Sequence, residues 1–133
     1  MNDAVISCGV RAGEQIYYSA MNYNALFRVD IRTGTAHFLA QFENESITEA
    51  YLHKRCFIYE GKIIFVPYRS HYIHIFDLSE QKQQSIFLDR CTDIVQRGGM
   101  NYEIAQINNV AYMFFENVAP YIRLDLDELT ITY

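Results

Sequence analysis

The sequence predicts an all-β protein made of three repeats, each with four short antiparallel strands. The first observation is a nine-residue pattern that recurs without gaps, LFRVDIRTG at 26–34, IHIFDLSEQ at 73–81 and YIRLDLDEL at 121–129. Its central acids are Asp30, Asp77 and Asp125, spaced 47 and 48 residues apart. An apolar residue precedes each of them and an aliphatic residue follows. Repeats at a fixed period indicate a fold assembled from equal units.

The second observation is that the same register holds further upstream. GEQIYYSA at 13–20 aligns with EGKIIFVP at 60–67 and with NNVAYMFF at 108–115. Each copy opens on a pair rich in Gly or Asn, residues that tolerate the left-handed angles of tight hairpin turns. Another apolar run lies before each turn. Strand, turn, strand is therefore the expected order at the start of every unit.

The third observation is composition. The runs between turns are rich in β-branched and aromatic residues, as strands are. We expect one domain over 1–133, with units at about 4–42, 52–88 and 102–133, joined by connectors 43–51 and 89–100. A short helix is admissible only at Ser46–Arg55, where SITE resembles a capping box.

Four-stranded units with a period of 40–50 residues are typical of β-propeller blades. The alternative is an ordinary antiparallel sandwich or barrel with accidental similarity. The segments IYYSAMNYNALFRVDIRTG and GKIIFVPYRSHYIHIFDLSEQK resemble Kelch-like or TolB/YWTD-like blades. The resemblance covers nearly the whole chain but is generic: there is no Trp, and the doublet Gly98-Gly99 lies before the third unit rather than after a second strand. It implies a fold and no particular activity.

Three blades make a half-propeller, because closed rings have about 4–8 blades. The first and last blades would each expose an apolar face, which favours association. We expect a homodimer that completes a six-bladed ring. The alternative is that the chain is a fragment of a larger propeller.

Composition excludes several classes of function. The net charge of −5 argues against a general nucleic-acid binder. No apolar run approaches the roughly 20 residues of a membrane helix, so no membrane partner is expected. The three cysteines are few and odd in number, and the N-terminus has no basic leader, which indicates reduced thiols in a cytoplasmic protein.

Candidate chemistry is sparse, and we expect no cofactor, no metal site and no catalytic residue. His53-x-x-Cys56 and His71-x-x-His74 resemble metal-ligand spacings. Residues three apart in a strand point to opposite faces, so neither pair converges. His74 is expected to be a packed histidine with one nitrogen hydrogen-bonded. The three repeated aspartates are expected to cap turns rather than to catalyse.

Ligands of propellers bind at loops on one face. The loops between the second and third strands are MNYN, YRSH and ENVAP, where the copies stop resembling one another. The expected ligand-binding residues are Tyr23, Asn24, Tyr68, Arg69, His71, Glu116 and Asn117. The favoured function is a noncatalytic binding or scaffold module for a protein, peptide or glycan. The alternative is a glycan-active hydrolase or lyase with acids and His71 near the ring centre.

Overall fold

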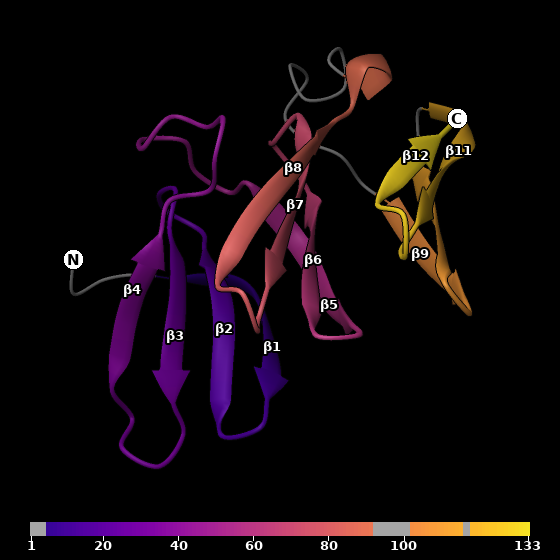
Figure 1. The fold of residues 1–133 in the computed structure, drawn as a ribbon. Coiled ribbons are helices and arrows are strands. Elements are labelled where there is room, and N and C mark those ends of the chain that lie inside the picture. Colours follow the sequence, from indigo (N-terminus) through magenta and orange to yellow (C-terminus); the bar gives the residue numbers. More distant parts are fainter. Residues whose placement is uncertain (1–4, 92–101, 116–117) are drawn as a thin grey trace.

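The fold is all-β, as the sequence predicts. A computed structural model describes residues 5–91, 102–115 and 118–133, and its strands form three four-stranded antiparallel sheets in strict sequence order. Figure 1 shows the sheets following one another from the N-terminal to the C-terminal end. Sheet 1 holds β1 (Ile6–Ala12), β2 (Gln15–Ala20), β3 (Leu26–Asp30) and β4 (Ala36–Ala40). Sheet 2 holds β5 (His53–Tyr59), β6 (Lys62–Pro67), β7 (Tyr72–Asp77) and β8 (Lys82–Phe87). Sheet 3 holds β9 (Tyr102–Ile107), β10 (Val110–Phe115), β11 (Val118–Asp125) and β12 (Thr130–Thr132).

The repeated aspartates cap the turns between the third and fourth strands, which confirms that expectation. In each sheet one carboxylate oxygen accepts hydrogen bonds from two backbone N–H groups, two and three residues further on. The bond from the Arg32 N–H is the main cause that lowers the pKa of Asp30. The same kind of bond, chiefly from Glu80, lowers the pKa of Asp77. These acids are therefore turn architecture.

The core lies in two seams between neighbouring sheets. In the first seam, Tyr17 and Leu26 of sheet 1 pack against Ile63, Phe65 and Phe76 of sheet 2. The second seam has the same pattern one sheet further on: its buried residues are Ile64, Val66, Ile73, Ile75 and Leu88 of sheet 2, and Ala111, Met113, Ile122, Leu124 and Leu126 of sheet 3. Since side chains alternate along a strand, each sheet uses one set of positions toward the preceding sheet and the other set toward the following one.

Most of the predicted core positions of the third strand are buried. Phe76, Ile122 and Leu124 are buried, as expected. Phe27 is buried too, although it lies on the side of sheet 1 that has no preceding sheet. Val29 and Leu78 are half-buried, and Ile31 is 37% exposed.

The short helix that the sequence admits at Ser46–Arg55 does not form: the N–H of Glu49 donates to the carbonyl of Ser46 in a single turn, and His53 already begins β5. One local expectation was wrong. The third variable loop is shorter than ENVAP, because β11 begins at Val118. Within the described ranges no helix is long and apolar enough to cross a membrane.

Candidate functional site

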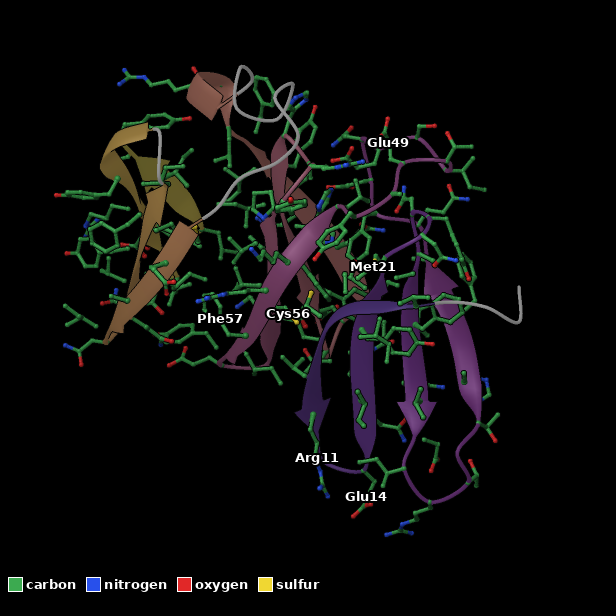
Figure 2. The ribbon with its side chains drawn as sticks, turned by 180° about the vertical axis from the view of Figure 1, so that it is seen from behind. Arg11, Glu14, Met21, Glu49, Cys56 and Phe57 are labelled. Carbon is green, nitrogen blue, oxygen red and sulfur yellow. The ribbon has the colours of Figure 1, made fainter. Side chains whose placement is uncertain are left out.

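The variable loops of sheets 1 and 2 lie at one end of the molecule, together with the connector between β4 and β5. Backbone hydrogen bonds join them there. The N–H of Tyr51 donates to the carbonyl of Met21, and the N–H of Arg69 donates to the carbonyl of Tyr51 over 3.2 Å. Figure 2 labels Met21 and Glu49 at this end, with Arg11 and Glu14 at the opposite one. We call the first end the loop end and the second the turn end.

Tyr68, Arg69 and His71 come from one loop and remain candidates for ligand contact. Arg69 is exposed, and Tyr68 and His71 are half-buried. The ring of Tyr68 lies 4.5 Å from the ring of Tyr51, and the Lys54 ammonium lies 5.5 Å from the Tyr68 centroid. Aromatic rings beside cations suit peptides and sugars, which offer both apolar faces and polar edges.

Sequence reasoning missed Tyr51. Its φ of 57° is a left-handed conformation that a bulky residue rarely adopts. Its N–H and its carbonyl link the loop of sheet 1 to the loop of sheet 2, which is what holds it in this conformation. A tyrosine in a connector gives no sequence signal for such a role.

Asn24 was predicted to contact ligand, and the structure places it inside the protein. Only 1% of its surface is exposed. Its amide oxygen accepts a hydrogen bond from the Phe42 N–H at 2.7 Å, and its amide nitrogen donates to the carbonyls of Phe42 and Glu45. Asn24 therefore fastens the connector to its own sheet: both of its amide hydrogens are used within the protein, and burial keeps its oxygen away from a ligand.

Tyr23 belongs to the loop of sheet 1, but its ring packs on the outer face of that sheet. Its ring meets the ring of Phe27 edge-on at 6.2 Å. Its hydroxyl is buried and has no hydrogen-bond partner among the described residues. Two further predicted site residues, Glu116 and Asn117, lie outside the described residues.

A buried chain of hydrogen bonds crosses the first seam beneath the loop end. The hydroxyl of Ser19 lies 2.8 Å from Nδ1 of His53, whose Nε2 lies 2.8 Å from Nδ1 of His74. Nε2 of His74 lies 2.9 Å from the backbone carbonyl of Glu43. The expectation of one bonded nitrogen was wrong, because both nitrogens of His74 are bonded. The two histidines come from the two separate pairs singled out in the sequence, and they converge on each other.

The carbonyl of Glu43 fixes the direction of this chain, because a carbonyl can only accept. Nε2 of His74 must therefore carry a hydrogen, and in the neutral ring its Nδ1 accepts. Nε2 of His53 then donates to His74, and the hydroxyl of Ser19 donates to Nδ1 of His53. Every donor and acceptor is matched with both rings neutral.

Burial keeps both rings neutral. It lowers the pKa of His53 well below its ordinary value, and His74 adds to that effect. Burial also lowers the pKa of His74 to about 4. The carboxylate of Glu45 lies 3.9 Å from Nε2 of His74, but this contact is not an ion pair near neutral pH, because the ring is uncharged. Burial raises the pKa of Glu45, whose carboxylate also accepts a hydrogen bond from Ser70.

A serine hydrogen-bonded to a histidine, which is itself bonded to a second histidine, suggests a nucleophile and its base. The burial of these groups argues against catalysis. Only 1% of the surface of Ser19 is exposed, and His53 is fully buried. A nucleophile must reach its substrate, and here the ring of Phe42 covers His53 at 4.4 Å. The chain instead satisfies polar groups that the seam removes from water.

One hollow in the described surface lies away from the predicted site. It has a volume of about 210 Å³ and lies toward the turn end of sheet 2. Its lining residues are Lys62, Ile75, Asp77, Glu80, Lys82, Gln83 and Gln84. Among the described residues, no group of three or more His, Cys, Asp or Glu side chains could hold a metal ion.

Comparison with known proteins finds similar shapes and no family. No family model matches the sequence, and no curated protein matches it. The chain is similar to the extracellular domain described for the hybrid two component system BT4673 of B. thetaiotaomicron, with TM-score 0.63 and 12% identity over 93% of this chain and 15% of that one.

Two further solved structures have a similar shape. U3-55K matches with TM-score 0.66 and 11% identity over 98% of this chain and 39% of that one. The computationally designed Ika8 protein matches with TM-score 0.60 and 9% identity over 97% of this chain and 36% of that one. The chain thus spans well under half the length of the solved chains it matches, and identities this low show the fold alone.

Proposed function

We propose that the chain is a noncatalytic binding or scaffold module of the β-propeller type, with Kelch-like or TolB/YWTD-like blades. Two copies close a six-bladed ring, and the loop end binds a protein, peptide or glycan. The observation that carries the proposal is that the two outermost sheet faces present the same strand positions that pack sheet against sheet inside the chain.

The outer face of sheet 1 is aromatic. Tyr18 and Phe27 occupy the positions that Phe65 and His74 use in the first seam. The ring of Phe27 stacks on Tyr18 at 5.2 Å and meets Phe38 at 5.8 Å. Phe38 is 47% exposed, so this face offers a large apolar side chain to a partner.

The outer face of sheet 3 is its counterpart. Tyr112 and Tyr121 occupy the positions that Ile64 and Ile73 use in the second seam. Their rings lie 5.6 Å apart, and Phe114, which is 44% exposed, lies 5.7 Å from Tyr121. A contact of sheet 3 with sheet 1 of a second copy would extend the packing of the two internal seams. Two such contacts close a ring with twofold symmetry.

The loop end supplies the binding surface in this proposal. Tyr68 and Arg69 are of the residue types that dominate protein interfaces, and Tyr51 adds a second ring. The most reactive constellation in the described part of the chain, Ser19 with His53 and His74, is buried. The module therefore binds without transforming its ligand.

Association is tested by the mass in solution. We expect the wild-type chain to have twice its mass of 15.6 kDa, and Phe114→Asp to have the mass of one chain because it places a charge in the contact. Phe87→Asp is the matched control: Phe87 is 49% exposed but belongs to the middle sheet, so this variant should stay dimeric. A monomeric wild type, or equal dissociation of both variants, would contradict the ring.

Ligand binding at the loop end is tested on panels of immobilised peptides and oligosaccharides. For whichever probe binds best, the triple variant Tyr68→Ala, Arg69→Ala, His71→Ala should bind at least about 10-fold more weakly, because removing an interface anchor costs about 1–2 kcal/mol or more. The control is Glu80→Ala with Lys82→Ala, which alters the hollow toward the turn end and should leave affinity unchanged. The reverse result would move the binding site to that hollow.

A further inference from the structure

Two of the three cysteines meet in the first seam. Cys8 lies in β1 opposite Ser19, and Cys56 lies in β5 opposite Phe65. Residues paired across antiparallel strands point to the same side of their sheet. Ser19 points into the first seam toward His53, and Phe65 packs in the same seam from the other side. Both thiols therefore point into this seam from opposite sheets.

The two thiols lie close together there. Strands β1 and β5 are neighbours, both side chains pack against the buried cluster of the seam, and the Cys8 thiol raises the pKa of the Cys56 thiol. Both cysteines are free and half-buried, so a small oxidant can reach them. Figure 2 labels Cys56 where β5 passes the first sheet. A register shift in β1 directly before Cys8 and another in β5 between His53 and Arg55 mark irregular backbone beside each thiol.

We propose that Cys8 and Cys56 are an oxidative modification site, at which a peroxide converts the two thiols into a disulfide that joins sheet 1 to sheet 2. The Cys8 sulfur attacks one peroxide oxygen, and the O–O bond breaks. The other oxygen leaves as water, and Cys8 becomes a sulfenic acid. The Cys56 sulfur then attacks the Cys8 sulfur. An S–S bond forms, and the sulfenic oxygen leaves as a second water. The two thiols lose two electrons and two protons, and hydrogen peroxide is reduced to two waters.

Proximity to the Cys8 thiol is the main cause that raises the pKa of the Cys56 thiol, and burial adds to it. The two thiols can exchange roles, because the products and the balance are the same whichever sulfur attacks the peroxide first. The product would tie together two segments 48 residues apart in sequence, across the seam that holds the Ser19–His53–His74 chain.

The test treats the wild-type chain with dilute hydrogen peroxide and maps its peptides without reduction. We expect one intramolecular cross-link between the peptides that carry Cys8 and Cys56, a mass lower by two hydrogen atoms, and a melting temperature higher by on the order of 10 °C. A reductant should reverse all three. Cys91→Ser, which removes the third cysteine, should behave as the wild type does, whereas Cys8→Ser and Cys56→Ser should form no cross-link.

Peptide mapping of the wild type decides the matter even if a serine variant folds poorly. The proposal is overturned if peroxide produces only sulfinic or sulfonic acids on these residues. It is equally overturned if the cross-links run through Cys91 between chains. Neither outcome bears on whether the chain dimerises, because the first seam is internal to one chain.

Discussion

Lowering the pH from about 7 to about 5 is expected to reduce the free energy of unfolding by about 4 kcal/mol, through the His53–His74 pair. In the unfolded chain both rings take up a proton near their ordinary pKa of about 6.5. In the folded chain burial keeps the pKa of His74 at about 4 and that of His53 well below its ordinary value. At a pH between the folded and the unfolded pKa values, only the unfolded state binds the protons, so acid favours unfolding.

The magnitude follows from proton linkage. Each histidine that is protonated only in the unfolded state contributes up to about 1.4 kcal/mol per pH unit. Glu45 acts in the opposite direction, because burial raises its pKa and the folded state gains a proton there first. The capping acids Asp30 and Asp77 have lowered pKa values, so their contribution is lost only at still lower pH.

Urea unfolding at fixed protein concentration, repeated across this pH range, measures the effect. His53→Gln keeps a donor and an acceptor in the seam but does not titrate, so it should roughly halve the pH dependence. His37→Asn is the control, because His37 is exposed in β4, and it should leave the dependence unchanged. A flat profile for the wild type would show that the pair is solvated or charged in the folded state.

The fold was predictable because its determinants are local. The repeat around Asp30 fixes both a strand pattern and the capped turn that follows it, because each copy carries the aspartate with an apolar residue on either side. Period-two alternation then assigns the buried faces, so that Leu124 and Phe76 are buried as predicted. Phe27 is buried although sheet 1 has no preceding sheet, because the rings of Tyr18 and Phe38 pack against it. Ile31, on the same side, is exposed.

The site was less predictable, because it depends on contacts between segments distant in sequence. Asn24 resembles a loop asparagine until the connector at Phe42 folds over it. In the sequence, His53 and His74 belong to two separate pairs whose members point to opposite faces of a strand. They meet because β5 and β7 place them on the same face of sheet 2. No local pattern encodes either arrangement.

Phe65→Ala tests both the packing of the first seam and the buried histidine chain. We expect it to lower the free energy of unfolding by about 4 kcal/mol at neutral pH. Phe65 is fully buried in the first seam, with ring centroids 4.9 Å from Phe42 and 5.2 Å from His53. Its removal leaves a cavity beside the polar chain, where hydrogen-bonding groups can hold water.

Water in that cavity would also alter the pH dependence. Solvation of His53 removes the main cause of its lowered pKa, so the pKa should rise toward its ordinary value. The variant should therefore lose less stability than the wild type on acidification, although it starts from a lower value. Phe87→Ala removes the same atoms from an exposed position and should cost below about 1 kcal/mol with the pH profile unchanged. Equal costs for the two variants would contradict the packing of the seam, whereas an unchanged profile in Phe65→Ala would show that the ring does not keep water from the histidines.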